Sequence, residues 1–477
     1  MKKKKLLILI SIGVFLALAI FILGQLGFYG LGSVNSVNEK YPKGSVELPI
    51  PGILDDLNSD PNKAEFYITA QNGTHQFFDG VETSTLGYNG SFLGPVIKVR
   101  TGEEVTIHVE NQLDKETTVH WHGLKVDGAM DGGVHSHIHP GSKWIANFTI
   151  NQPATTLWYH PHQMGETAIQ VYNGLVGLFL IEDEISDELN IPKDYGYNDI
   201  PLIIQDKDFD KNGQLDYQLT IRDYNMGKIG DTIIVNGAIN PYVEVPKGLV
   251  RFRILNGSNG GIYDLELSTK TEFYQIASDG GFLEKPVKLN KLRLGPAERA
   301  EILVDFSKLS NEEKIELMNN GSSFMQFFIK DDEVLSAKHF EVPKQLTEIE
   351  RLKESDAIQT REFIFGGYGK FVNINHKKMD MDRIDEVVSL NTIEVWNINN
   401  WTGTLHPFHA HGVQFQILER EGKAPPENES GWEDTFLVGP GEDVKVIAKF
   451  ENKGLFMYHC HILEHEDAGM MGQFLVE

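Results

Sequence analysis

The sequence predicts an all-β protein that contains three copies of one sandwich fold. Beyond residue 60 of the 477-residue chain, short alternating strands separated by turn residues dominate. A Val/Ile-rich strand followed by an asparagine-containing turn occurs three times, at 104–111, 249–256 and 391–399. Self-similarity of this kind indicates a repeated structural unit. A chain of 477 residues is long enough for two to four domains with sizeable cores.

Each repeat is followed by a Gly/Pro turn and a further strand. The turns are Pro140-Gly141, Gly295-Pro296 and Pro440-Gly441. In the first and third repeats that strand leads to a histidine motif, whereas the second has no histidine motif at this place. We therefore expect metal ligands in the outer units and a spacer in the middle one, which could also shape a substrate entrance. The predicted domains are residues 61–186, 198–345 and 361–477.

The N-terminus predicts an export or anchoring segment at residues 1–32. Four lysines follow Met1, and the chain is then apolar from Leu6 to Gly24. This run is near the length that spans a bilayer, and no clear Ala-x-Ala cleavage site follows it. We expect an uncleaved signal-anchor that keeps the body outside the membrane, followed by a tether at 33–60. The alternative is a cleaved signal peptide and a secreted protein.

Charge and cysteine content narrow the possible functions. The chain has 43 Lys+Arg against 68 Asp+Glu, a formal net charge of −25, which argues against nucleic acid as a partner. The single cysteine, Cys460, excludes an intramolecular disulfide. An unpaired thiol in an exported protein needs a reason, and burial as a metal thiolate supplies one.

The segment 459–461 (His-Cys-His) is the most informative motif. Successive side chains of a strand point to opposite faces, so Cys460 faces one way and the two histidines face the other. Cys460, His465 and Met470 offer three ligands of a mononuclear blue-copper site, because copper takes imidazole, thiolate and a weak axial thioether. His406 is the candidate for the second histidine, since it is left over from the paired histidines.

Eight histidines form four His-x-His pairs. Each alternation puts two imidazoles on one face of a strand. Three metal ions bound by three, three and two histidines would use all eight and leave open positions for oxygen. The pairs are His120/His122, His160/His162, His409/His411 and His459/His461.

These motifs resemble the four copper-binding signatures of multicopper oxidases. They read HWHG at 120–123, HPH at 160–162, HPFHAHG at 406–412 and HCHILEHEDAGM at 459–470. The resemblance covers roughly residues 60–477 and is closest to bacterial three-domain laccases and copper-efflux oxidases. It implies three cupredoxin-like (Greek-key β-sandwich) domains and four copper ions: one type 1, one type 2 and two type 3.

The resemblance also implies which residues bind each copper. Type 1 copper would lie in the third domain, and the other three ions would lie between the first and third domains. Type 2 copper would be bound by His120 and His409. The type 3 pair would be bound by His122, His160, His162, His411, His459 and His461. Type 1 copper would be bound by His406, Cys460, His465 and Met470.

The activity implied is oxidation of a one-electron donor at type 1 copper, coupled to four-electron reduction of dioxygen to water. The donor would be a phenol, an amine or a low-valent metal ion. Electrons would enter through His406 or His465 and reach the type 3 histidines through Cys460. Asp131 and Glu466 resemble acids that supply protons to the oxygen-binding cluster. A second interpretation is that they orient copper-bound histidines, and the two roles are compatible.

Several alternatives depend on smaller features. The loop 135–139 (HSHIH) could bind a metal, but a solvent-exposed polar loop is favoured. The methionine-rich insert of copper-efflux oxidases is missing, with only Met379 and Met381 nearby, which argues against a specialised cuprous oxidase. A non-catalytic cell-envelope protein of the same fold is another alternative, although such relatives lose their ligands. Copper nitrite reductases lack four His-x-His pairs, and zinc hydrolases rarely need twelve such ligands.

Overall fold

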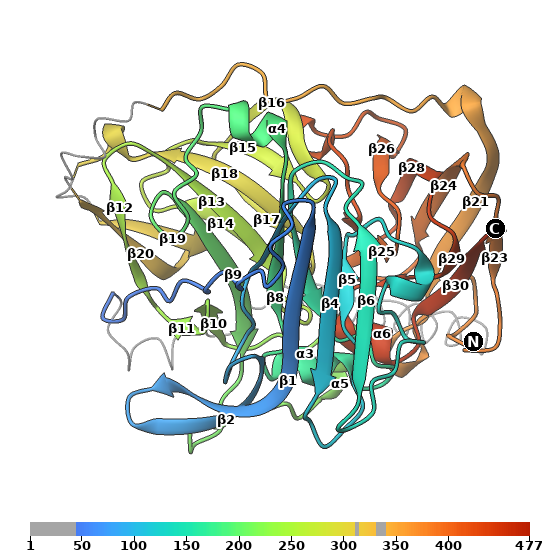
Figure 1. Ribbon diagram of the computed structural model, residues 1–477, viewed down its shortest axis with the longest axis horizontal. Helices are drawn as coiled ribbons and strands as arrows, with labels where there is room; N and C mark the ends of the chain where they lie inside the picture. The colour runs from blue at the N-terminus through green and yellow to red at the C-terminus, as the bar shows by residue number, and fades with distance from the viewer. Residues whose placement is uncertain (1–43, 311–313, 331–339) are drawn as a thin grey trace, which may run out of the picture.

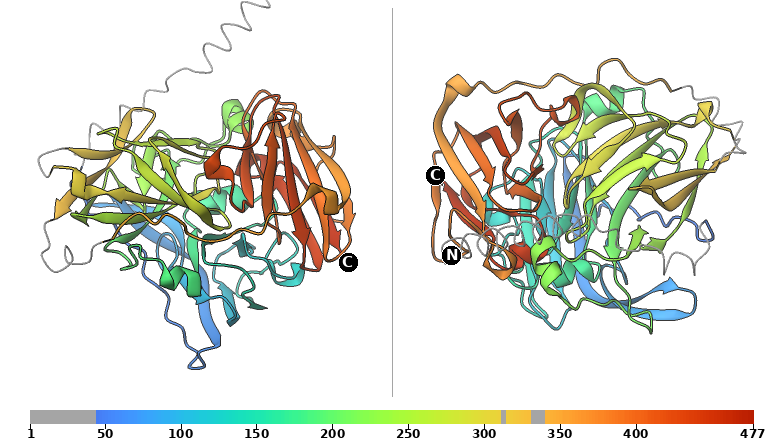
Figure 2. Two further views of the ribbon diagram at one scale, coloured as in Figure 1. Left: turned by 90° about the horizontal axis from the view of Figure 1, so that it is seen from above. Right: turned by 180° about the vertical axis from the view of Figure 1, so that it is seen from behind.

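Three β-sandwiches, each formed by one continuous stretch of chain, make up the body of the protein. The structure is a computed structural model that describes residues 44–310, 314–330 and 340–477. Figure 1 shows the second sandwich on the left in green and yellow, the third on the right in orange and red, and the first between them in blue. Figure 2 shows the same arrangement from above and from behind. The predicted membrane segment at 1–32 lies outside the described residues, and within them no helix has the length and apolarity to span a membrane.

The first sandwich has two four-stranded sheets, in the orders β2-β1-β4-β6 and β3-β8-β7-β5. Its core forms where alternate strand residues point inward, as Val105, Ile107 and Val109 do in β4. Three short helices, η1 (Gly128–Met130), α3 (Thr167–Tyr172) and α4 (Glu184–Glu188), connect or follow the strands. The strands are β1 (Lys63–Phe78), β2 (Val81–Tyr88), β3 (Ile97–Arg100), β4 (Glu104–Asn111), β5 (His120–His122), β6 (Lys143–Thr149), β7 (Thr155–His160) and β8 (Gly177–Glu182).

The second sandwich pairs a seven-stranded sheet, β11-β10-β9-β13-β18-β15-β16, with a five-stranded sheet, β12-β20-β19-β14-β17. It also contains α5 (Ile221–Met226) and η2 (Phe306–Lys308). The strands are β9 (Asp199–Lys207), β10 (Thr232–Val235), β11 (Ala238–Ile239), β12 (Tyr242–Pro246), β13 (Leu249–Asn256), β14 (Tyr263–Leu267), β15 (Phe273–Ser278), β16 (Gly281–Leu289), β17 (Leu292–Leu294), β18 (Arg299–Asp305), β19 (Ile315–Asn319) and β20 (Ser322–Lys330).

The third sandwich has two five-stranded sheets, β22-β21-β24-β28-β26 and β23-β30-β29-β25-β27. It also contains η3 (Glu354–Asp356), η4 (Gly369–Phe371), η5 (Glu427–Glu429) and α6 (Leu463–Asp467). The strands are β21 (Ala357–Gly366), β22 (Asn373–Ile374), β23 (Glu386–Val388), β24 (Thr392–Asn400), β25 (His406–Ala410), β26 (Phe415–Arg420), β27 (Thr435–Val438), β28 (Asp443–Phe450), β29 (Gly454–Cys460) and β30 (Met471–Val476).

The predicted repeats occupy the same place in all three sandwiches. Strands β4, β13 and β24 each pair in parallel with the first long strand of their sandwich, β1, β9 and β21. On the other side each pairs antiparallel with the strand that follows the Gly/Pro turn, β6, β18 and β28. The predicted repetition is therefore present in the fold. The domain limits given above stay a prediction.

A buried asparagine ends each repeat strand. These residues are Asn111, Asn256 and Asn400, and each is 0 % exposed. In each case Oδ1 accepts from the amide two residues further on, at 2.9, 3.1 and 2.9 Å. Nδ2 donates to a carbonyl of a distant segment, at 2.7, 3.0 and 2.9 Å. One amide side chain thus satisfies backbone groups where the strand turns, which explains why the motif recurs.

Candidate metal centre

A buried cysteine–histidine cluster lies at one end of the third sandwich. His406 Nδ1 is 3.3 Å from Cys460 Sγ, and His465 Nδ1 is 3.7 Å from the same sulfur. Met470 belongs to the same apolar core as Cys460, and both are 0 % exposed. Burial raises the pKa of the Cys460 thiol. A thiolate at this position therefore needs a cation beside it, as a bound metal would provide.

The register between strands β25 and β29 brings Cys460 and His406 together. β25 pairs antiparallel with β29, with Phe408 opposite Cys460. Because side chains alternate along a strand, Cys460 points into the core of the third sandwich and His459 points away from it. The predicted opposition is therefore present for Cys460 and His459, while His461 follows the end of β29.

The outward-facing nitrogens of both cluster histidines are occupied. His406 Nε2 lies 2.7 Å from Thr402 Oγ1 and 3.0 Å from Thr404 Oγ1. His465 Nε2 lies 3.2 Å from the carbonyl oxygen of Tyr224, in α5 of the second sandwich. Each ring is thus oriented with Nδ1 towards the sulfur, the arrangement by which outer contacts fix metal-binding imidazoles.

Eight buried histidines gather where the first and third sandwiches meet. β5 pairs with β7, which sets His120 opposite His160, and β25 pairs with β29, which sets His409 opposite His459. Stacked rings join the two sandwiches. The ring centroids are 3.8 Å apart for His120 and His411, and 3.7 Å apart for His122 and His409. Each of the eight is 0 % exposed: His120, His122, His160, His162, His409, His411, His459 and His461.

Ring nitrogens of this cluster converge on shared points. His162 Nε2 and His411 Nε2 each lie 3.1 Å from His459 Nε2. Donor atoms of His120, His409 and His411 all lie within 4.8 Å of one another. Within the described residues, Nε2 of His120 and of His409 is buried without a hydrogen-bond partner. Buried nitrogens that share a space and lack partners are satisfied by a bound metal, so the donor set fits copper.

The two predicted acids contact ring nitrogens on the outer side of the cluster. Asp131 Oδ2 lies 2.7 Å from His411 Nδ1 and 3.3 Å from His120 Nδ1. Glu466 Oε1 lies 3.5 Å from His162 Nδ1, and its Oε2 lies 3.4 Å from His459 Nδ1. Burial raises the pKa of Glu466 well above its ordinary range. These positions suit both predicted roles, orientation of the rings and delivery of protons.

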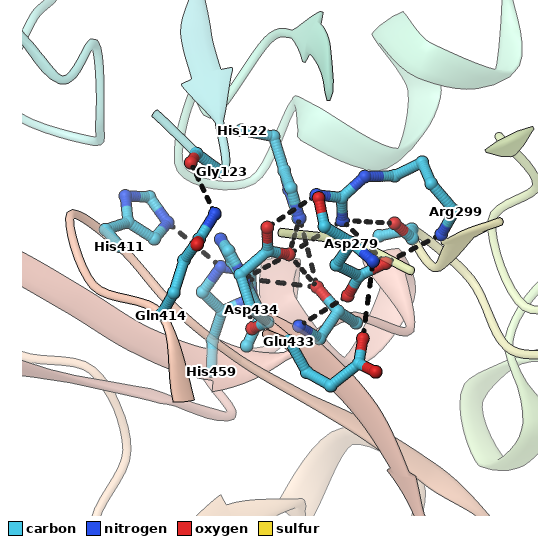
Figure 3. A network of polar contacts seen from close by, with 12 residues as sticks. His122, Gly123, Asp279, Arg299, His411, Gln414, Glu433, Asp434 and His459 are labelled. Carbon is cyan, nitrogen blue, oxygen red and sulfur yellow. Dashed lines mark hydrogen bonds and ion pairs between the residues drawn. The ribbon is translucent and has the colours of Figure 1, made fainter. Parts of the chain in front are cut away.

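Sequence reasoning missed a third acid at the cluster, Asp434, which Figure 3 shows beside His122. Asp434 Oδ1 lies 3.0 Å from His122 Nε2, and the Asp434 carbonyl oxygen lies 2.8 Å from His409 Nδ1. The sequence feature that could have indicated Asp434 is a pair of acidic residues, Glu433 and Asp434, directly before the apolar strand β27. A carboxylate that enters a buried strand needs a partner there.

The three histidines of the loop 135–139 contact polar side chains from elsewhere in the chain. His135, His137 and His139 contact Gln473, Gln163 and Glu116, at 2.5, 2.9 and 2.5 Å. In the part of the chain that the structure describes, these three histidines are not among the groups whose donor atoms converge.

Five methionines pack together in a separate cluster: Met164, Met379, Met381, Met457 and Met471.

A cavity of about 440 Å³ lies between the second and third sandwiches, next to the cysteine cluster. Leu405 and Ile462, which flank the ligand motifs, line its inner wall, and Met226 of α5 lines it as well. Asp206 also lines the cavity and accepts from the Tyr263 hydroxyl at 2.7 Å. Burial raises the pKa of Asp206 to about 6. The cavity is therefore mostly apolar with a few acidic groups, as small-molecule sites are.

A cysteine-centred cluster and a histidine cluster joined by one strand define a metal-binding redox protein of the cupredoxin type. Multicopper oxidase domain families match residues 69–186 and 345–477. The multicopper oxidase mco of Staphylococcus aureus is 41% identical over 438 residues, covering 91% of this chain and 93% of that protein. The chain belongs to the multicopper oxidase family.

Two further relatives widen the comparison. A crystal structure of a laccase from Pediococcus acidilactici matches with a TM-score of 0.86 and 38% identity, covering 91% of this chain and 94% of that one. This match confirms the predicted all-β, cupredoxin-like fold. The cell division protein FtsP of Xenorhabdus nematophila is 34% identical, covering 90% of this chain and 92% of that protein. Family membership supports oxidoreductase activity and copper binding, while the relatives differ in their named roles.

Proposed function

We propose that this protein is a laccase-like oxidase that takes single electrons from small donors and reduces dioxygen to water. The observation that carries the proposal is the gathering of twelve predicted ligands into two buried clusters that share the segment 459–461. Copper, when bound, would supply one-electron redox chemistry and the binding of oxygen. The N-terminal sequence supports an extracytoplasmic location for the body of the protein, with an anchor in the membrane.

The site residues divide between the two clusters. His406, Cys460, His465 and Met470 would hold type 1 copper. His120 and His409 would hold type 2 copper. His122, His160, His162, His411, His459 and His461 would hold the type 3 pair. Support comes from the distances within each cluster and from the anchoring of outer ring nitrogens by carbonyls and carboxylates.

Protein groups between and around the clusters have defined tasks. Cys460 is covalently flanked by His459 and His461, so one stretch of backbone links the donor side to the oxygen side. Asp131 keeps two rings in place, His411 through its carboxylate and His120 through its backbone carbonyl oxygen. Glu466 lies against ring nitrogens of His162 and His459, so its carboxyl group is placed to pass protons to the oxygen side. Dioxygen reduction to two waters consumes four protons, which such a group would relay.

The cavity between the second and third sandwiches is the proposed donor site. Its wall includes Leu405, next to the type 1 ligand His406, and Ile462, whose amide lies 3.4 Å from Cys460 Sγ, so a bound donor would lie close to type 1 copper. An electron-rich phenol or amine fits an apolar cavity, and the Asp206 carboxylate can accept its proton. A weak axial thioether from Met470 gives a moderate potential, which favours easily oxidised donors.

Cuprous ion is a second candidate donor, and the methionine cluster favours it. Met164, Met379 and Met381 are partly buried, and they pack against the fully buried Met457 and Met471. Thioether sulfur is a soft ligand that selects Cu(I). The chain has no methionine-rich insert before the third-domain motif, but Met379 and Met381 form this cluster together with methionines from distant segments.

A non-catalytic role in the cell envelope is a further alternative, because one relative is named a cell division protein. The complete ligand set supports an enzyme instead. Measuring copper content together with oxygen uptake separates the two. We expect about four copper ions per chain and oxygen uptake with a phenol, Fe(II) or Cu(I). A copper-loaded protein that takes up no oxygen with any of these donors would contradict the proposal.

The donors can be distinguished with paired variants. Met379→Leu and Met381→Leu preserve apolar volume but remove sulfur. If Cu(I) binds at the methionine cluster, these variants should lose cuprous oxidation and keep phenol oxidation. Asp206→Asn should lose phenol oxidation and keep cuprous oxidation, since Asp206 lines the cavity between the second and third sandwiches. Loss of both activities in every variant would indicate general damage and leave neither donor assigned to its site.

A further inference from the structure

A buried arginine of the second sandwich, which has no ligand motif, reaches the histidine cluster. Arg299 begins β18, and its side chain is 0 % exposed. Its Nη1 donates to Asp434 Oδ1 at 2.7 Å and its Nη2 donates to Asp434 Oδ2 at 2.5 Å. Figure 3 shows this contact between the second and third sandwiches. A two-pronged guanidinium–carboxylate pair fixes the plane of the carboxylate as well as its position.

Asp434, held in place by Arg299, contacts histidines from two different sandwiches. Its Oδ1 accepts from His122 Nε2, from the first sandwich, at 3.0 Å. Its backbone carbonyl oxygen lies 2.8 Å from Nδ1 of His409, from the third sandwich. The opposite nitrogen of each ring is then directed into the cluster. A single residue thereby sets the orientation of two ligands that belong to separate units.

Asp279 secures the same segment from a second direction. It lies between β15 and β16, and its Oδ1 accepts from the Arg299 amide at 2.8 Å. Its Oδ2 accepts from the Thr435 amide at 2.9 Å. Thr435 Oγ1 in turn lies 3.0 Å from His122 Nε2 and 3.2 Å from His409 Nδ1. Two residues of the second sandwich therefore hold both Asp434 and Thr435 against the rings.

The charges in this contact depend on one another. Arg299 and Asp434 side chains are 0 % exposed and Asp279 is 1 % exposed. A buried carboxylate without its guanidinium is an unpaired charge, which the fold accommodates only by moving the side chain or admitting water. Either response would release His122 and His409 from their orientation. The cysteine cluster would be spared, because its contact with the second sandwich is a separate one, through Tyr224.

We propose that Arg299 and Asp279 are positioning residues for the oxygen-side copper cluster, and that the second sandwich aligns ligands contributed by the other two. This proposal rests on the proposed function insofar as the histidine cluster binds copper. The middle sandwich is then more than the spacer expected from its lack of histidines. The rival interpretation is that Arg299 only stabilises the fold, as buried ion pairs elsewhere in the chain do.

Paired substitutions on neighbouring strands separate the two interpretations. Arg251 on β13 is the matched control: it is buried, it forms an ion pair with Glu301, and β13 pairs directly with β18. Arg299→Gln and Arg251→Gln each remove a buried charge. Arg299→Lys and Arg251→Lys keep the charge but lose the planar fork. The full-length protein of each variant is loaded with copper under identical conditions.

Four readouts are taken from each variant: copper per chain, the type 2 electron paramagnetic resonance signal, the blue absorbance and the thermal midpoint. For Arg299→Gln we expect a perturbed type 2 signal and release of type 2 copper at about 10- to 100-fold lower chelator concentration. The blue absorbance per chain should stay unchanged. Arg299→Lys should lie between Arg299→Gln and wild type. Both Arg251 variants should keep wild-type spectra even where the thermal midpoint falls.

Several results would overturn the proposal. An unchanged type 2 signal and chelator response in Arg299→Gln would do so, as would parallel loss of the blue and type 2 signals in the Arg299 and Arg251 variants. If Arg299→Gln fails to fold, Arg299→Lys and Asp279→Asn decide by the same readouts. Wild-type protein that lacks type 2 and type 3 copper would instead contradict the proposed function, so the two failures are distinguishable.

Discussion

Replacing Asp131 with asparagine should slow oxygen reduction without slowing electron uptake. The Asp131 carboxylate contacts His411 Nδ1 at 2.7 Å and His120 Nδ1 at 3.3 Å, and its exposure is 2%. The substitution keeps the shape of the side chain and one possible acceptor, but it removes the charge and the carboxyl group that could exchange a proton. The change is therefore confined to the oxygen side.

The expected size of the effect follows from these contacts. A hydrogen bond to a charged group contributes about 1.5–3 kcal/mol, and a neutral one contributes about half as much. With the His411 contact weakened and the longer His120 contact losing its charge, the loss is about 1–3 kcal/mol, or roughly 5- to 150-fold in rate. Loss of an outer-shell partner at other metal sites typically costs a comparable 10- to 100-fold.

Stopped-flow absorbance separates the two half-reactions. Anaerobic mixing with a phenol measures bleaching of the blue band, and mixing reduced enzyme with dioxygen measures its return. We expect bleaching at the wild-type rate and a slowed return, with copper content unchanged. Glu466→Gln is the companion variant, since its oxygens lie against two other rings. Equal slowing of both half-reactions in Asp131→Asn would refute a proton role, and copper loss would assign the residue to orientation alone.

Four further outcomes are expected. Cys460→Ser should abolish the blue band and oxygen uptake together, because a hydroxyl does not replace a thiolate at blue copper; a blue variant would contradict the assignment. Met470→Leu should raise the type 1 potential in a redox titration, whereas Met471→Leu should change it little, since Met470 shares a core with Cys460 and Met471 faces the methionine cluster. Burial raises the pKa of Asp206 to about 6, so the carboxyl group has lost its proton above that pH. Asp206→Asn should therefore lower kcat/KM for phenols above pH of about 6. Below that pH the variant and the wild type should converge. Phenol turnover should proceed without added copper, and turnover seen only with excess Cu(II) would indicate a cuprous oxidase.

Much of the metal chemistry could be read from local sequence. A His-x-His pair within a strand presents both rings on one face whatever the surrounding fold, because the side-chain period of a strand is two. The same period separates Cys460 from its two neighbouring histidines. The three repeats were also visible, since a Val/Ile strand that ends in a buried asparagine is a local pattern with a local hydrogen-bonding reason.

Other parts of the site have no signature in the sequence. Asp434 and Arg299 are 135 positions apart, and neither lies in a recognisable motif. The five clustered methionines come from distant segments, so counting methionines near one motif found Met379 and Met381 but not the three that complete the cluster. For the loop 135–139, the sequence favoured a solvent-exposed polar loop over a metal site, and the structure shows its three histidines exposed, with His137 and His139 both contacting Glu116.

The sequence by itself determined the kinds of candidate ligand, their close spacing at strands or strand ends and the all-β repeat, since these depend on neighbouring residues and on side-chain chemistry. The tertiary structure alone decided which pairs face one another, which acids hold them, and that the second sandwich supplies Arg299 and Asp279 to a cluster in which it has no ligand. The physical reason is that contacts between sandwiches depend on how whole sheets pack. Such packing buries charged side chains only where partners from distant parts of the chain come together. Contacts of this kind produce no periodic pattern in the sequence.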